Sequence, residues 1–394
     1  MIVSLLGLVI SLFAYLIAFP SDRGRRFDVY FALLGLHVIA AIGFWLQSFE
    51  SAMDAFMYYR DPYHYVRESP FSSGTIFIVH FTQGIRTWLG GSFFDHFLFY
   101  QCFGMIGVAL LMRSLGDIAE SLEMPVPIET YLLLFLPGLH FWTAGIGKDA
   151  PMLLAVSLAI WSVIRLDKRF AWLGLALVIM ALVRPHIMPF VGAGVVGALM
   201  LSRRTSPRLR LILTPVAAAG FVFMLFRAAE SLNIDTVSVD SLSGFVDQQQ
   251  SFGDDYGSGA NLGDLPLPLK IFTLMFRPFW FDTGGLMGYA ASAENTVLLG
   301  LFLYLLYHWK LLWNLGRSVF VVTYCVVYGS LLTLSLAMVS YNIGLGQRMK
   351  MMVIPAILLL VGTVYLYKKY LGRPLTVVQP EPSPGPAESA AARA

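Results

Sequence analysis

The feature that most constrains this chain is a series of apolar runs, each about as long as a bilayer core is thick. The first, residues 1–19, reads MIVSLLGLVISLFAYLIAF and contains no charged side chain. In hydrocarbon every backbone N–H and C=O needs an internal partner, so such a run crosses a membrane only as a helix or in a closed barrel. Barrel strands alternate apolar and polar residues, and these runs do not. The sequence therefore predicts an all-α polytopic integral membrane protein.

Composition supports this fold class and excludes others. Of the 394 residues, 57% are hydrophobic and 13% are charged, whereas soluble domains average about 25% charged residues. A soluble fold of this size cannot hide so many apolar side chains from water. Soluble enzymes, disordered chains and nucleic-acid-binding proteins are therefore excluded as the main interpretation. The two cysteines, Cys102 and Cys325, lie inside apolar runs and predict neither a disulfide framework nor a zinc site.

We expect about 11 transmembrane helices from the positions of the apolar runs. The predicted spans are residues 1–19, 29–47, 93–112, 128–142, 150–164, 170–183, 187–201, 211–226, 296–309, 318–338 and 351–367. The basic segment SDRGRR follows the first run, no basic residue precedes it, and no signal-peptide cleavage site follows it. By the positive-inside rule the amino terminus then lies outside, and eleven spans leave the carboxyl terminus in the cytoplasm.

The chain is expected to form a single transmembrane helical domain over residues 1–373, with external loops at 48–92 and 227–295. Residues 374–394 are rich in Pro, Ala and Ser and predict a disordered cytoplasmic tail.

Two segments of the loops are expected to lie near the membrane surface. Residues 74–92 predict an interfacial amphipathic helix, and residues 269–281, which contain Pro278, predict a re-entrant or interfacial segment. The centres of the predicted spans hold almost no ionisable residues except His37, for which a hydrogen-bonded structural role is the favoured interpretation.

Four external clusters carry charged side chains, and the first lies in the loop 48–73. Asp54 and Asp61 are separated by seven residues, or two helical turns, which would direct both carboxylates to one side. Pro62 disfavours a helical Asp61. One interpretation is a carboxylate pair that serves as a base or binds a metal ion. The other is a solvated loop whose tyrosines lie at the membrane interface.

The second and third clusters each lie between two short apolar runs. Lys148 and Asp149 form either a functional site or a tight turn with a local ion pair; they are not a phosphate-binding loop, because no strand precedes them and no Ser or Thr follows the lysine. In Arg184-Pro185-His186, the arginine suits bidentate contacts to phosphate. His186 is either a base, a donor to phosphate or an interfacial hydrogen-bonding residue.

The fourth cluster consists of RPFWFD at 277–282 and NIGLGQRMK at 342–350, which place Arg277, Arg348 and Lys350 at the membrane edge. Snorkelling explains one isolated arginine at such an edge, but less easily several. We predict that Arg184, Arg277 and Arg348 point into one external pocket.

The chemistry of these clusters suits an amphiphile with an anionic head, such as a lipid-linked sugar phosphate. Arginine and lysine would stabilise the charge on a departing diphosphate, while a carboxylate or histidine would take the proton from an acceptor hydroxyl. The predicted catalytic residues are Asp54, Asp61, Asp149 and His186. The predicted phosphate- or substrate-binding residues are Lys148, Arg184, Arg277, Arg348 and Lys350.

Four blocks of the sequence carry a family resemblance: FWTAGIGKDAPMLL, ALVRPHIMPF, FRPFWFDTG followed by AENTVLL, and NIGLGQRMKMMVIP. They resemble segments of bacterial polytopic polysaccharide-assembly proteins similar to O-antigen and exopolysaccharide polymerases and, more distantly, to GT-C membrane glycosyltransferases. The resemblance implies an undecaprenyl-diphosphate-linked oligosaccharide as substrate, at the periplasmic face of the bacterial inner membrane. It also implies membrane lipids and other polysaccharide-assembly proteins as partners.

The metal requirement and two other functions stay open at this point. GT-C enzymes carry acidic residues in the first external loop, where Asp54 and Asp61 lie, but this loop has no adjacent acidic pair, so a divalent metal ion is not assured. A transporter or flippase for lipid-linked glycans would place ionisable residues near the middle of the membrane. A non-catalytic assembly partner would have scattered external charges and no cavity.

Overall fold

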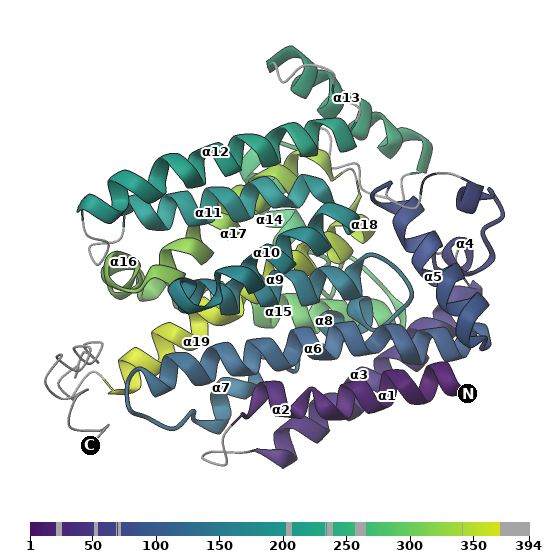
Figure 1. The fold of residues 1–394 in the computed structure, drawn as a ribbon, viewed down its shortest axis with the longest axis horizontal. Coiled ribbons are helices and arrows are strands. Elements are labelled where there is room, and N and C mark those ends of the chain that lie inside the picture. Colours follow the sequence, from purple (N-terminus) through teal and green to yellow (C-terminus); the bar gives the residue numbers. More distant parts are fainter. Residues whose placement is uncertain are drawn as a thin grey trace, which may run out of the picture.

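The computed structural model describes residues 1–20, 26–50, 54–67, 69, 72–201, 207–232, 234, 239–256, 265–340 and 342–370. Its ordered elements within these ranges are all helical, which confirms the all-α part of the predicted fold class (Figure 1). The helices are α1 (Ile2–Phe13), α2 (Tyr15–Ala18), α3 (Phe27–Glu50), α4 (Asp54–Arg60), α5 (Thr75–Leu89), α6 (Phe93–Glu120), α7 (Ile128–Leu132), α8 (Pro137–Thr143), α9 (Asp149–Ile164), α10 (Leu166–Val183), α11 (Met188–Leu201), α12 (Pro207–Ser231), α13 (Val239–Tyr256), α14 (Leu267–Phe276), α15 (Gly285–Tyr307), α16 (Trp309–Ser318), α17 (Phe320–Val339), α18 (Ile343–Met349) and α19 (Ile354–Tyr370), with the 3-10 turns η1 (Tyr65–Arg67), η2 (Pro185–Ile187) and η3 (Lys350–Met352).

Five helical segments in the described part of the chain are long and apolar enough to cross a membrane. They are α3, α6, the Leu213–Ser231 part of α12, α15 and α17. A sixth is obtained if Ile343–Met352 and Ile354–Tyr370, which meet at an angle of 55°, form one broken span. Several other predicted spans correspond to apolar helices of 10–17 residues, shorter than the roughly 20 residues that a straight crossing needs. The structure thus supports five or six spans by length and composition, where the sequence predicted about 11.

Many large apolar side chains are exposed on the outer helices of the molecule, which suits contact with lipid. Leu5 on α1, Ile39 on α3, Phe226 on α12 and Leu303 on α15 are all exposed. Helix α6 lies between such outer helices, is mostly buried and packs against α1, α9 and α19. A Cβ atom placed on Gly107 of α6 would lie 2.8 Å from Leu153 Cγ, so α9 approaches α6 where a side chain is missing.

Several predicted loop segments differ from the structure in their extent. The predicted interfacial helix 74–92 is α5, and the predicted re-entrant segment 269–281 contains all but the first two residues of the ten-residue α14, followed by a non-helical turn. Helix α15 begins at Gly285, eleven residues before the predicted span at 296. The predicted tail, 374–394, lies outside the described residues.

The two ends of the helix bundle differ in what they carry. Helices α4, α5 and α18 lie at one end, on the right of Figure 1, together with the amino terminus. Helix α16 and the last turn of α19 lie at the opposite end, on the left of the same view. Charged residues at the first end enclose the candidate site.

Candidate functional site

A cavity of about 510 Å³ opens between segments that are far apart in the sequence. It is lined by Asp54, Tyr65, Ser73, Gly74, Thr75, Ile76, Lys148, Val183, Arg184, Pro185, His186, Ser231, Leu232, Leu345, Arg348 and Met349. These residues come from α4, η1, the start of α5, the turns before α9 and α11, the end of α12, and α18. The cavity therefore exists only once the helices have packed.

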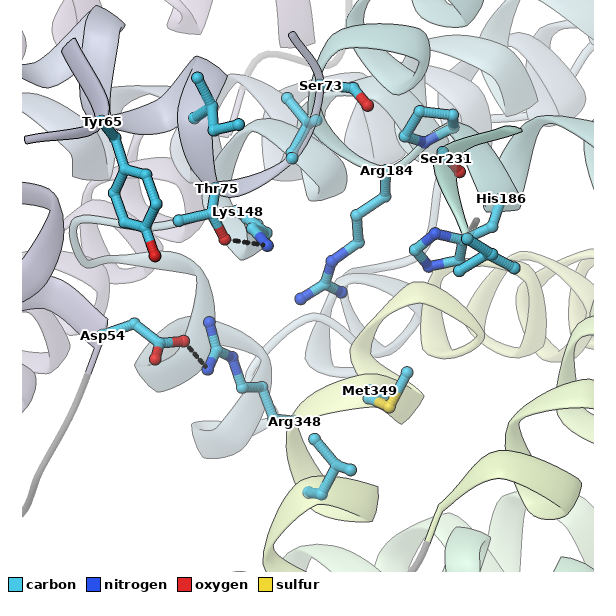
Figure 2. Close-up of a pocket in the computed structure, with 16 residues that line it drawn as sticks. Asp54, Tyr65, Ser73, Thr75, Lys148, Arg184, His186, Ser231, Arg348 and Met349 are labelled. Carbon is cyan, nitrogen blue, oxygen red and sulfur yellow. Dashed lines mark hydrogen bonds and ion pairs between the residues drawn. The ribbon is translucent and has the colours of Figure 1, made fainter. Parts of the chain in front are cut away.

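Three cations from three segments point toward the same open space, as Figure 2 shows. Lys148 precedes α9, Arg184 follows α10, and Arg348 lies on α18. The Lys148 ammonium donates a hydrogen bond to Thr75 Oγ1 at 2.9 Å, which leaves two of its three protons for another acceptor. The structure thus brings together two of the three arginines that were expected to share a pocket, and adds Lys148 to them.

Asp149 lies beneath these cations and binds both guanidinium groups. Its side chain is 5% exposed; Oδ1 lies 2.8 Å from Arg184 Nη2, and Oδ2 lies 2.5 Å from Arg348 Nε. Arg348 Nη1 also lies 3.0 Å from Asp54 Oδ2 at the mouth of the cavity. Three cations therefore face two carboxylates, which leaves one net positive charge for a bound anion. Asp149 serves to orient the arginines, because both of its oxygens are engaged by guanidinium groups.

The surroundings of Lys148 and His186 change their protonation. Burial, reinforced by the charge of Arg184, lowers the pKa of Lys148 to about 8. Burial and the charges of Arg184 and Lys148 lower the pKa of His186 to about 3. His186 is therefore a neutral imidazole at neutral pH, and no residue in the described part of the chain forms a hydrogen bond with its ring. The same cations make this imidazole a weak base, and an anion bound in the cavity would offset their charge and raise its pKa.

Gly74 joins two of the segments that supply the cavity. Its φ of 76° is a left-handed conformation that favours glycine. Its N–H donates to the carbonyl of Leu182 at 2.8 Å, which ties the start of α5 to the end of α10, two residues before Arg184. A Cβ at this position would lie 3.8 Å from Lys148 Nζ. This is an ordinary contact distance, so the backbone conformation of the turn, and not crowding by the lysine, favours glycine here.

Asp61 is a predicted catalytic residue that does not line the cavity. Helix α4 ends at Arg60, and Asp61 follows it with a φ of 48°. Its carboxylate accepts hydrogen bonds from the N–H groups of Tyr65 (2.7 Å) and Val66 (3.1 Å). Of the two interpretations of this loop, the structure does not support a pair of Asp54 and Asp61 on one helical face, because the helix stops between them, as Pro62 suggested, and Asp61 stabilises the following turn.

Arg277 and Lys350, two predicted ligand-binding residues, also lie outside the cavity lining. The Arg277 guanidinium pairs with Asp282 in its own loop, with Nη2 2.6 Å from Oδ1. Lys350 is fully buried and donates to Asn295 Oδ1 and to the carbonyl of Met275. Residues two apart on a helical turn point roughly 200° apart, so when Arg348 faces the cavity Lys350 faces the interior.

Glu294 and Asn295 were missed as polar residues of the interior, because the predicted span began after them. Both are buried in α15; the Glu294 carboxylate accepts from the N–H of Gly138, and Asn295 Nδ2 donates to the carbonyl of Pro278 at 2.9 Å. One feature of the sequence could have indicated them: Glu294 lies within an apolar stretch, and a glutamate in a membrane helix needs a partner.

A second buried polar contact joins His37 of α3 to His140 of α8. Their Nδ1 atoms are 2.9 Å apart, while His37 Nε2 lies 3.1 Å from the carbonyl of Gln101 and His140 Nε2 lies 2.8 Å from the carbonyl of Leu134. A carbonyl oxygen only accepts hydrogen bonds, so both Nε2 atoms carry protons. A hydrogen bond between the Nδ1 atoms then needs a third proton on the pair.

In the described segments, no group of three or more His, Cys, Asp or Glu side chains lies close enough together to hold a metal ion. No protein-family model, curated protein or solved structure matches this chain. Function is therefore argued from the cavity and its charges.

Proposed function

We propose that the cavity binds the phosphate or diphosphate head of a lipid-linked sugar. The protein would then be a membrane glycosyltransferase or polysaccharide polymerase of the bacterial inner membrane. The observation that carries this proposal is the meeting of Lys148, Arg184 and Arg348 in one cavity at one end of a bundle of apolar helices. Guanidinium groups match phosphate oxygens in bidentate contacts, and the apolar outer surface offers room for a polyprenyl tail.

The residues supply the parts that glycosyl transfer from a lipid diphosphate requires. The oxygen of an acceptor hydroxyl attacks the anomeric carbon, the bond from that carbon to the diphosphate oxygen breaks, and its electron pair leaves with the diphosphate. Lys148, Arg184 and Arg348 stabilise the charge on the leaving group. Neutral His186 accepts the hydroxyl proton once the bound diphosphate offsets the charges of Arg184 and Lys148, which hold its pKa low in the empty cavity. Asp149 holds both arginines in place and takes no part in proton transfer.

The proposal places the cavity on the outer face of the membrane, with the amino terminus outside and the carboxyl terminus in the cytoplasm. The last turns of α6 and α19 lie with α16 at the opposite end of the bundle (Figure 1), and the junction of α9 and α10 pairs with the end of α6. These segments carry many basic residues. They include Arg113, Arg165, Arg169, Lys310, Arg317, Lys368 and Lys369. The positive-inside rule assigns that end to the cytoplasm. An expected total of about 11 crossings would count the shorter apolar helices as spans.

Cells in which the chain is the sole source of this activity provide the test. Arg184→Ala and Arg348→Ala are expected to abolish surface polysaccharide or shorten its chains at normal protein levels. Arg277→Ala is the matched control, because it removes an arginine that does not line the cavity. Unchanged polymer yield and length in both cavity variants would contradict the proposal.

A transporter or flippase for lipid-linked glycans is the second candidate. Glu294 and Lys350 are buried within helices, as are His37 and His140, and such groups are typical of proton-coupled transport. Proteoliposomes separate the two functions. A glycosyltransferase makes a new glycosidic bond when donor and acceptor lipids are present on one side. A flippase moves labelled lipid across the bilayer and makes no new bond.

A further inference from the structure

A buried dipeptide in α15, Glu294-Asn295, is tied to the segments that form the cavity without lining it. Glu294 is 4% exposed and Asn295 is fully buried. Together they contact the N–H of Gly138, the carbonyl of Pro278 and the ammonium of Lys350. These partners belong to three segments that are far apart in the sequence.

The first partner leads to the Lys148–Asp149 turn. Gly138 lies in the first turn of α8, a helix of seven residues that ends at Thr143. Only five residues separate that end from Asp149. The hydrogen bond from the Gly138 N–H to Glu294 therefore fixes the start of the short segment that carries Lys148 and Asp149.

The other two partners lead to Arg348. Lys350 follows Arg348 by two residues and donates to Asn295 Oδ1. Asn295 also donates to the carbonyl of Pro278, and the carbonyl of the preceding Arg277 accepts a hydrogen bond from Gln347. Lys350 contacts Asn295 directly, and Gln347 is connected to Asn295 through the backbone of residues 277–278. The backbone on both sides of Arg348 is thus held at Asn295 of α15.

Two of these buried residues, Glu294 and Lys350, have ionisable side chains. A buried lysine or glutamate is costly unless an opposite charge and hydrogen bonds accompany it. Lys350 and Glu294 interact electrostatically with each other. The Glu294 carboxylate accepts a hydrogen bond from Gly138 of α8, and the Lys350 ammonium of η3 donates one to Asn295 of α15. A displacement of α8 or η3 would leave one of these charges buried without compensation, so the pair restricts both segments to one arrangement.

We propose that Glu294, Asn295 and Lys350 are positioning residues that hold the Lys148–Asp149 turn and Arg348 in register and thereby set the anion affinity of the cavity. The inference rests on the proposed function in so far as the anion is a phosphate. It extends that function to residues that do not line the cavity. A shift of about 1 Å in a ligand-binding group, caused by a change elsewhere in the protein, is enough to reduce activity strongly.

The test compares two variants that each remove a buried cation near a buried carboxylate in the purified full-length protein. Lys350→Met removes the cation that interacts with Glu294, and Arg169→Met removes one of the two arginines that pair with Asp117, 2.6 Å away at the opposite end of the bundle. Both are expected to lower the melting temperature. Only Lys350→Met is expected to weaken the binding of inorganic pyrophosphate, by about tenfold or more. Equal pyrophosphate affinity in the two variants would overturn the inference.

A second measurement does not depend on pyrophosphate. The pH profile of Lys148 acylation, followed by mass spectrometry, is expected to have a midpoint near 8 in the wild type. Glu294→Leu should move that midpoint toward the value of about 10.4 for a solvated lysine. Glu294→Gln keeps an acceptor for the Gly138 N–H and should move it less, while Arg169→Met should leave it unchanged.

The two measurements separate the two proposals. If the wild type does not bind pyrophosphate, the proposed function fails, and the acylation profile alone decides whether the positioning residues act on the turn. If Glu294→Leu leaves the Lys148 midpoint where it is in the wild type, the positioning inference fails whatever the pyrophosphate result.

Discussion

Asp149 contacts two guanidinium groups at once, and this contact decides what the neighbouring cations are able to do. Two arginines that face the same cavity repel each other, and the carboxylate between them permits their close approach. Asp54 offers Arg348 a second carboxylate, but its side chain is 48% exposed and the pair is screened by water. An incoming phosphate therefore competes with Asp54 far more easily than with Asp149.

Lys148 gives the cavity a pH dependence that can be measured directly. Its pKa lies at about 8, and a lysine is charged below its pKa, so the third cation is present at neutral pH and is lost as the pH rises through about 8. We expect the affinity for pyrophosphate to fall over this range in the wild type. Lys148→Arg keeps its positive charge throughout this pH range. Its affinity for pyrophosphate should therefore fall less with rising pH than that of the wild type.

Calorimetric titrations of both proteins across this pH range provide the measurement. Pyrophosphate itself titrates, and the Arg variant experiences that change equally, so the difference between the two profiles reports Lys148. Identical profiles would show that the charge of Lys148 does not contribute to binding.

At the level of single helices, α15 shows where local sequence patterns mislead. Its residues Glu294 and Asn295 lower the apolar character of the first half, which is why the predicted span began at 296. The helix begins at Gly285 and includes both polar residues, which find partners on α8 and η3. Those partners lie 156 and 55 residues away in the sequence, so no local pattern indicates them.

The contact between α6 and α9 yields a prediction with a control in the same helix. Gly107→Ala would place a methyl group 2.8 Å from Leu153 Cγ, whereas a methyl group on Gly116 of α6 would meet no atom within 4 Å. We expect Gly107→Ala to destabilise the protein by about 1–3 kcal/mol through overpacking. Gly116→Ala should be neutral or slightly stabilising, because alanine favours helix by up to about 1 kcal/mol over glycine.

Thermal unfolding of the two variants in one detergent checks this prediction. If Gly107→Ala melts at the same temperature as Gly116→Ala, the close approach of α9 to α6 is not present in solution.

For the whole molecule, the sequence predicted the helical membrane body and several residues of the cavity, but not their full set. Lys148, Arg184 and Arg348 could be selected because charges at the ends of apolar runs are expected to have a function or a partner. Arg277 has the same sequence signature, and only the geometry of its loop shows that Asp282 neutralises it. The number of spans could not be predicted from run length alone, because short helices and broken pairs satisfy the same pattern.

The orientation of the bundle is testable with single cysteines, since Cys102 and Cys325 are both buried. Tyr63→Cys places an exposed thiol near the cavity end, and Lys310→Cys places one on α16. A membrane-impermeant maleimide should label the first variant in intact cells and the second only after permeabilisation. The opposite pattern would place the cavity in the cytoplasm.

The most direct measurement is the binding of inorganic pyrophosphate to the purified protein by isothermal titration calorimetry. The wild type and Arg277→Ala are expected to bind it with similar affinity. Arg184→Ala and Arg348→Ala should each weaken binding by about tenfold or more, because each removes charge-assisted hydrogen bonds. Absence of binding by the wild type, or an equal loss in all three variants, would contradict the claim that these separate cations form one anion site.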